Sequence, residues 1–347
     1  MPAIYEEKIR KQGIKSLLRA RSFLYVLESL PISKTQKYLA KGYTSYKPSF
    51  KEIDLLKQEV EALIDKDAEG FMQKHFPPKS LRPSSAFRHY RRYINILVDN
   101  VAVSLRKRKR DAKNFSKDQE QRLEKYPDYY RRNFHYQTDG YLSDASAEKY
   151  EHQVEILFKG TADPMRRRMV SLFKENNLSL GKKALELGAG VGSNTLFMAY
   201  AFGETEITCL DLSESYLQKA KSNLRDFSNI NFYRGEAENL GFKDASYDSV
   251  FSTFLFHELP LEVRVAVLDE AHRVLKPGGL IAIADSIQLG DIESLDWAIK
   301  DFPKNFHEPF YTNYIKTAME GLLESAGFEI LYVDKTFLTK TILAKKI

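Results

Sequence analysis

Three glycines stand at every second position, directly after a short apolar run in this 347-residue chain. The run is Ala184 to Leu187, and the glycines are Gly188, Gly190 and Gly192. Because glycine has no Cβ, the backbone can turn sharply there and approach a ligand closely. We expect a helix over about 194–202, capped by Ser193, whose N-terminal N–H groups face the turn. This arrangement is typical of a nucleotide-type cofactor site at the end of a parallel strand.

Acidic side chains follow the next expected strands, at the edge where a parallel sheet holds its ligand. Asp211 stands 21 positions after Gly190 (211 − 190), where a carboxylate can bind both hydroxyls of a ribose. Glu236 precedes Ala237 in a loop where a carboxylate and a backbone N–H can bind the edge of an adenine. A dinucleotide site would also carry an acid near Asp211, so this residue alone leaves the cofactor open. The dinucleotide fingerprint needs glycine where this chain has Ser193, which weakens that alternative.

From Lys183 onward, alternating strands and helices predict a parallel sheet with helices on both faces. We expect seven strands, over residues 183–187, 206–210, 230–233, 248–252, 280–284, 329–333 and 337–344. Further helices are expected over about 214–226, 261–275 and 313–326. The short segment Asp334 to Thr336 leaves room only for a hairpin between the last two strands. The closing strand must therefore run antiparallel to its neighbour.

The N-terminal third of the chain reads as mostly helical. Helices are expected from about Ile14 to a stop at Pro31, then over about 50–71 and 85–110. The last of these ends in a basic run, Arg106 to Arg110. This run could contact RNA or an anionic membrane, or could simply be a solvated helix end where cations suit the helix dipole.

Charge is divided unevenly along the chain. Residues 1–135 carry 30 Lys+Arg against 16 Asp+Glu, a net charge of +14, and the remaining 23 and 31 give −8, for the total of +6. Such a split indicates two functional parts, the first of which could meet an acidic partner.

Aromatic and amide side chains gather between Tyr126 and Gly160. This composition suits a loop that covers a ligand, and it suits equally well a domain junction that buries its rings. A helix is expected over 145–158. Another is expected to begin at the pair Asp163-Pro164, read as N-cap and first helical residue, and to end at Asn176.

Together these segments resemble the class I S-adenosylmethionine-dependent methyltransferase superfamily, most closely its type 11 branch, which includes the quinone-biosynthesis methyltransferases. The matching text is Leu185 to Gly192, Leu210 to Ser213, Gly235 to Glu238, Phe251 to His257 and Glu270 to Gly279. The resemblance implies an α/β fold, a Rossmann-like seven-stranded methyltransferase sheet with an antiparallel last strand, here preceded by an α-helical N-terminal region. We expect three parts: a basic helical region (1–125), an aromatic-rich cap with linker helices (126–180) and a SAM-binding methyltransferase domain (181–347).

The resemblance also implies that S-adenosyl-L-methionine (SAM) is the cofactor. The methionine part would lie against Glu186, Gly188, Ala189 and Gly190. Asp211 would bind the ribose hydroxyls, and Leu212 would pack on the adenine. Glu236, where this family more often has aspartate, would bind the adenine edge together with the Ala237 N–H, and Phe254 would line the cofactor.

Methyl transfer from a sulfonium needs alignment of nucleophile, methyl and sulfur, which can contribute roughly 7–11 kcal/mol. Aromatic faces can lie against the cationic sulfur, and the candidates are Tyr136, Tyr141, Tyr150 and Phe254. His257 is the first candidate for a general base, with packing as its alternative role, and His307 is a candidate for substrate contact. No metal site is expected, and the single cysteine, Cys209, excludes a cysteine-based zinc site.

The leading interpretation is a SAM-dependent methyltransferase that acts on a small-molecule or lipid-like acceptor. An RNA or protein methyltransferase using the basic N-terminal region is the alternative, followed by an NAD-binding oxidoreductase or a non-catalytic SAM-binding protein. The lone cysteine and the lack of an apolar run of roughly 20 residues favour a cytoplasmic protein without a transmembrane segment. Besides the acceptor, nucleic acid and a second copy of the chain are the partners to consider.

Overall fold

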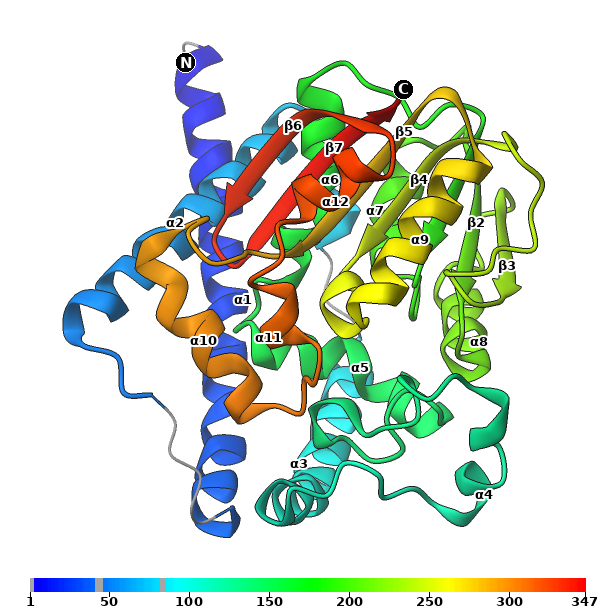
Figure 1. Ribbon diagram of the computed structural model, residues 1–347. Helices are drawn as coiled ribbons and strands as arrows, with labels where there is room; N and C mark the ends of the chain where they lie inside the picture. The colour runs from blue at the N-terminus through cyan, green and yellow to red at the C-terminus, as the bar shows by residue number, and fades with distance from the viewer. Residues whose placement is uncertain (1–2, 41–45, 82–84) are drawn as a thin grey trace.

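A computed structural model of the protein describes residues 3–40, 46–81 and 85–347. At its centre is a seven-stranded sheet with strand order β3-β2-β1-β4-β5-β7-β6 (Figure 1). The strands are β1 Lys183–Leu187, β2 Glu206–Asp211, β3 Ile230–Arg234, β4 Tyr247–Thr253, β5 Leu275–Ser286, β6 Phe328–Thr336 and β7 Thr339–Lys346. β7 is antiparallel to both β5 and β6, and the other paired strands are parallel. The predicted fold class is therefore confirmed, including the antiparallel last strand.

Helices cover both faces of the sheet, so its central strands are buried. Alternate side chains of a strand point to opposite faces. Leu185 and Leu187 of β1 pack in one cluster with α9 (Leu261–Val274), whereas Ala184 packs in another with α7 (Ser193–Ala201). The middle of these strands is therefore apolar, and the polar residues of the expected site lie at their carboxyl ends.

The remaining helices either line the sheet or lie at its carboxyl edge, beneath the strands in Figure 1. They are α1 Ala3–Leu39, α2 Phe50–Met72, α3 Ala86–Lys109, α4 Lys117–Glu120, α5 Asp144–Leu157, α6 Ala162–Glu175, α8 Glu214–Asn223, α10 Asp296–Asn305, α11 Tyr311–Tyr314 and α12 Met319–Ser325. The short 3-10 turns are η1 Pro78–Leu81, η2 Leu123–Lys125, η3 Phe134–Tyr136, η4 Phe256–Glu258 and η5 Glu293–Leu295. Among the described helices, none has the length and apolarity that crossing a membrane requires.

The expected stop at Pro31 is wrong, because α1 continues through it to Leu39. Proline removes a backbone donor and normally disturbs a helix. Here two side chains of α3 bond to carbonyls on either side of it: Tyr93 Oη donates to Glu28 O at 3.2 Å and Asn100 Nδ2 to Ile32 O at 3.2 Å. These bonds hold α1 against α3 on both sides of Pro31.

Two expected helix caps are also wrong. α6 begins one residue before Asp163, after Thr161. The Asp163 carboxylate is instead bound by Arg21 at 2.6 Å, a partner far away in the sequence. The cap of α7 is Gly192 in a left-handed conformation, and Ser193 is the first helical residue. Ser193 Oγ donates to Glu151 Oε1 at 3.0 Å instead of capping its own helix.

The C-terminal part differs from the expectation in two places. The helix expected over 313–326 is split into α11 and α12, and an unexpected helix, α10, precedes them. The carbonyls of Tyr314 and Thr317, near the break, both accept from Gln288 Nε2 at 2.5 Å. The hairpin turn lies at Phe337 and Leu338 rather than at 334–336, since β6 extends to Thr336.

The N-terminal helices contact the sheet region directly. α2 packs on α6, where Arg167 forms a fully buried bidentate pair with Asp67 at 2.8 and 2.6 Å. Lys66 of α2 also reaches Asp334 of β6 at 2.9 Å. The proposed division at residues 125 and 180 stays a prediction.

Two of the five cations in the basic run at 106–110 are buried. Arg106 donates to Tyr136 O at 2.9 Å and to Thr138 Oγ1 at 2.6 Å. Lys107 lies over the Phe306 ring at 5.5 Å, and burial lowers its pKa to about 8. Arg106 thus binds the aromatic segment, and Lys107 contacts the segment after α10. Neither interpretation of the basic run as an exposed surface describes these two side chains.

Candidate functional site

The glycine turn between β1 and α7 forms one wall of a cavity. Gly188, Gly190 and Gly192 have φ values of +66°, +55° and +78°, which disfavour other residues. A Cβ added at Gly188 would lie 3.0 Å from the Leu255 side chain, whereas one added at Gly190 would meet nothing within 4 Å. The backbone at Gly190 therefore faces open space, as a ligand cradle requires.

The cavity, called the first cavity below, has a volume of about 690 Å³. Seven of the expected cofactor residues line it: Gly188, Gly190, Asp211, Leu212, Glu236, Ala237 and Phe254. They come from the ends of β1, β2, β3 and β4, the edge that the sequence predicted.

Asp211 ends β2 with both carboxylate oxygens bound by backbone N–H groups. Oδ2 accepts from Gly190 at 2.7 Å and Oδ1 accepts from Ser213 at 2.8 Å. Burial raises the pKa of Asp211 to about 6, and these N–H bonds oppose that rise. The carboxylate thus links the glycine turn to the loop after β2, and each oxygen keeps a lone pair for a ligand hydroxyl.

Glu186 and Ala189 do not line the first cavity, although the sequence placed both at the cofactor. Glu186 is 1% exposed, and its carboxylate accepts from Thr195 Oγ1 of α7. Burial raises the pKa of Glu186 to about 8. In this conformation Glu186 ties β1 to α7 behind the turn, and its contact with a ligand stays a prediction.

The loop after β3 is closed by a tyrosine from the aromatic segment. Tyr129 Oη donates to Glu238 Oε1, two residues beyond Glu236. Glu236 itself is half-buried and borders the cavity. Tyr129 and Glu238 therefore restrict the opening beside the expected adenine position.

Tyrosine rings form the roof of the first cavity. Tyr141 and Tyr150 are joined there by Tyr130 and by Tyr216 of α8. The Tyr141 and Tyr216 centroids are 5.5 Å apart, and those of Tyr150 and Tyr216 are 5.4 Å apart. The aromatic segment accordingly both covers the cavity and packs on the sheet domain. The two interpretations of its composition, as a cover and as a domain junction, are therefore compatible.

Two expected lid residues lie elsewhere. Tyr136 and His307 border neither the first cavity nor the one beside it. Their rings contact each other at 5.5 Å, and the Tyr136 carbonyl accepts from Arg106. Their proposed contacts with substrate are not tested, and their position favours support of the roof.

A second cavity of about 650 Å³ adjoins the first, and Tyr150, Phe254 and Glu258 line both. Its other walls are largely apolar: Val154, Leu157, Phe158, Ala298, Ile299, Phe302 and Leu338. Phe254 has φ +56° at the end of β4, a conformation that costs of order 1–3 kcal/mol and is frequent at functional sites. Its ring stacks on Phe158 at 6.0 Å, between the two cavities.

His257 lines the second cavity and is held by Asp285 at the end of β5. Nδ1 lies 2.6 Å from Asp285 Oδ1, and Nε2 lies 4.0 Å from Glu258 Oε1. Burial opposes protonation of the ring, but the Asp285 charge outweighs it and raises the pKa of His257 to about 9. The other neighbour, Glu258, accepts from Tyr141 Oη at 2.5 Å.

Three residues of this site escaped the sequence reasoning: Asp285 as the partner of His257, and His135 and Glu308 beside it. Asp285 carried a signal, since it directly follows an expected strand. His135 and Glu308 carried none, because neither belongs to a motif. Burial lowers the pKa of His135 to about 3 and raises that of Glu308 well above its ordinary value.

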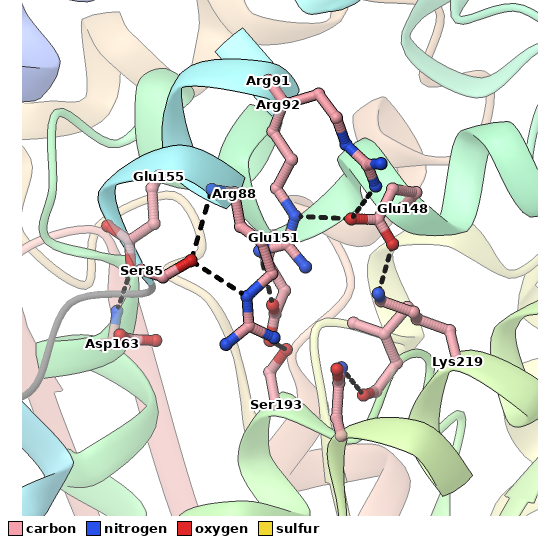
Figure 2. Close-up of polar contacts among 12 residues, drawn as sticks. Ser85, Arg88, Arg91, Arg92, Glu148, Glu151, Glu155, Asp163, Ser193 and Lys219 are labelled. Atoms are coloured by element: carbon pink, nitrogen blue, oxygen red, sulfur yellow. Dashed lines mark hydrogen bonds and ion pairs between the residues drawn. The ribbon is translucent and has the colours of Figure 1, made fainter.

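The roof is fixed to the sheet domain by polar contacts around α5 (Figure 2). Glu148 lies between Arg92 of α3, at 3.0 Å, and Lys219 of α8. One turn further, Glu151 accepts from Ser193 at the start of α7. α5 therefore bridges the N-terminal helices and the glycine turn.

Comparison with known proteins identifies the domain that carries this site. A family described as "Methyltransferase domain" matches residues 184–279. The demethylmenaquinone methyltransferase of Staphylococcus saprophyticus is 34% identical over 141 residues, which is 40% of this chain and 58% of that protein. Its counterpart in Staphylococcus haemolyticus is 36% identical over 118 residues, covering 34% and 48%.

The chain thus spans about half the length of these curated relatives. Among solved structures, a SAM-dependent methyltransferase from Aquifex aeolicus aligns with 59% of this chain and all of that one, at 18% identity and a TM-score of 0.44. The family match and the glycine turn, cavity and sheet order described above agree with the resemblance expected from the sequence. Residues 184–279 are a methyltransferase domain of the class I S-adenosylmethionine-dependent type, similar in sequence to the quinone-biosynthesis methyltransferases.

Proposed function

We propose that this chain transfers a methyl group from SAM to a small-molecule or lipid-like acceptor. The observation that carries the proposal is the pair of adjoining cavities. The first contains a glycine cradle and carboxylates suited to a nucleoside, and the second is mainly apolar. Bound SAM supplies an electrophilic methyl group on a sulfonium.

The residues of the first cavity suit SAM. Open space at Gly190 admits a bulky group, and Asp211 offers oxygen lone pairs to ribose hydroxyls. Glu236 and Ala237 border the same cavity, where they would bind the adenine edge. The tyrosine roof offers π faces to a cation.

The second cavity would bind the acceptor and align it with the methyl group. Its apolar walls favour an acceptor with a large hydrocarbon or ring surface. A third cavity, about 910 Å³ between α1, α3 and α5, shares His135, Tyr150, Val154 and Leu157 with it. This continuity suits an elongated acceptor. The quinone-type acceptor named for the relatives is one member of that class.

An acceptor of this kind fits better than RNA or protein. Arg106 and Lys107, two cations of the expected nucleic-acid contact, are buried in internal contacts. The walls of the acceptor cavity are largely apolar, which suits a hydrocarbon or ring surface better than a phosphate backbone. Nucleic-acid binding and a homodimer stay predictions.

Labelled-methyl transfer tests the proposal. The full chain is incubated with methyl-labelled SAM and cell extract, and the products are separated into small-molecule, RNA and protein fractions. We expect label in the organic-soluble small-molecule fraction. Label confined to RNA or protein would overturn the acceptor class, and failure to bind SAM by calorimetry would overturn the whole proposal.

His257→Asn should lower the rate of methyl transfer by roughly 100-fold without weakening SAM binding. We propose that Asp285 holds the imidazole ring of His257 in one orientation. Nε2 of this ring would then either exchange a proton with the acceptor or hold the acceptor in position. The measurement is labelled product formed per minute at saturating SAM. The matched control is His272→Gln, since His272 lies on α9 and borders neither cavity. Equal rates for His257→Asn and the native chain would contradict this role.

A further inference from the structure

A cluster of three groups that could bind a metal ion lies beside the second cavity, with Glu308 buried and His135 and Glu258 partly buried. His135, Glu258 and Glu308 come from η3, η4 and the segment after α10. One ligand atom from each lies within 4.8 Å of the other two, and His135 Nε2 is 3.1 Å from Glu308 Oε1. Two of the three, His135 and Glu258, line the second cavity.

Glu308 supplies the second observation. Its side chain is 0% exposed, and within the described residues neither carboxylate oxygen has a hydrogen-bond partner. His135 is near enough but is not aligned to donate a hydrogen bond. A buried carboxylate is strongly disfavoured unless it is paired, protonated or bound to a cation. The orphaned oxygens therefore point to a missing ligand.

We infer that His135 Nε2 and the carboxylates of Glu258 and Glu308 bind one divalent first-row transition-metal ion. Ligand atoms about 2.1 Å from such an ion lie roughly 3.4 Å apart at tetrahedral angles. The 3.1 Å separation of His135 Nε2 and Glu308 Oε1 is close to this spacing, and the Glu258 ligand atom lies within 4.8 Å of both groups. One imidazole and two carboxylates suit Zn²⁺, Fe²⁺ or Mn²⁺ better than a soft ion.

The surroundings complete the site. Tyr141 Oη donates to Glu258 at 2.5 Å, as outer-shell partners do for ligating carboxylates. Three protein ligands leave coordination positions free on the cavity side. An oxygen or nitrogen of the acceptor could bind the ion there. This role rests on the proposed methyl transfer, whereas binding of the ion itself does not depend on that proposal.

A second His/Glu cluster provides the comparison. Glu28, His89 and His152 also lie within 4.8 Å of one another. There, however, both Glu28 oxygens are already bonded, to His89 at 2.6 Å and to His152 at 2.8 Å. That cluster is satisfied without an ion.

The test is metal content of the full chain after dialysis against a chelator and reloading with Zn²⁺ or Mn²⁺. We expect about one bound ion per chain by mass spectrometry of the metals. Loss of an outer-shell partner alone typically weakens metal binding 10–100-fold, so Glu308→Gln and His135→Gln should weaken it by at least about tenfold. Glu28→Gln should bind the ion as the native chain does.

Co²⁺ is the spectroscopic probe, because its visible absorption reports the ligand set. Glu308→Gln keeps the shape of the side chain, and circular dichroism with SAM titration checks that each variant is folded. The inference would be overturned if the native chain held no more metal than the buffer. It would also be overturned if Glu28→Gln lost the ion and Glu308→Gln retained it. An ion bound by a chain that does not bind SAM would overturn only the proposed function.

Discussion

Asp211→Ala is expected to weaken SAM binding by roughly 100-fold. Two hydrogen bonds from ribose hydroxyls to a charged group are together worth about 3 kcal/mol, which is that factor in affinity. The carboxylate also orders the site, because it accepts from the backbone of Gly190 and of Ser213. Its removal would free the glycine turn as well as the ribose. Calorimetric titration with SAM measures the change.

Asp211→Asn separates these two effects. The amide keeps the size and one acceptor oxygen but loses the charge, so we expect binding between that of the native chain and that of Asp211→Ala. The matched control is Asp226→Ala, whose carboxylate is 85% exposed and distant from the cavity residues. Binding of SAM to Asp211→Ala within about twofold of native would contradict the assignment of the first cavity.

The sheet was predictable because its signals are local. Most strands are short and largely apolar, and β1, β2, β3 and β5 each have glycine or an acid at or next to the carboxyl end. The antiparallel β7 followed from chain length alone, since the segment between the last two strands cannot hold a crossover helix. The cavity residues at the strand ends could therefore be named before their geometry was known.

The errors arose where distant partners override local preference. α1 continues through Pro31 because side chains of α3 bond to the neighbouring carbonyls. Asp163 does not cap α6 but pairs with Arg21, 142 positions away. Ser193 likewise prefers Glu151 on α5. These contacts cannot be predicted from the residues that are adjacent in the sequence.

The cluster beside the second cavity is the extreme case. His135 and Glu308 are 173 positions apart (308 − 135), and neither lies in a recognisable motif. The fold brings them together because the aromatic segment and the segment after α10 close over the same strand ends. The expectation that no metal is bound stays a prediction, and motif reading along the sequence had no means of finding this cluster.

The buried pair between Arg167 of α6 and Asp67 of α2 is expected to give the largest change in stability. Both side chains are 0–1% exposed, and the guanidinium lies 5.1–5.6 Å from the rings of Phe71, Phe76 and Phe197. Arg167→Ala leaves Asp67 charged without a partner in an apolar site. We expect a loss of about 3–5 kcal/mol in the free energy of unfolding, a fall in Tm on the order of 10 °C.

A double variant distinguishes the charge from the packing. Asp67→Leu combined with Arg167→Met removes both charges and keeps the volume, so it should recover most of the stability lost by Arg167→Ala, because replacing a buried ion pair by apolar groups is often neutral. The exposed pair of Lys57 and Asp54 is the control: its side chains are 70% and 66% exposed, and Lys57→Ala should change stability by less than about 1 kcal/mol. Urea unfolding followed by circular dichroism measures all three. If the double variant is no more stable than Arg167→Ala, the stabilisation comes from the stacked guanidinium rather than from charge pairing. The packing of α2 on α6 then depends on the contact of Arg167 with the three phenylalanine rings.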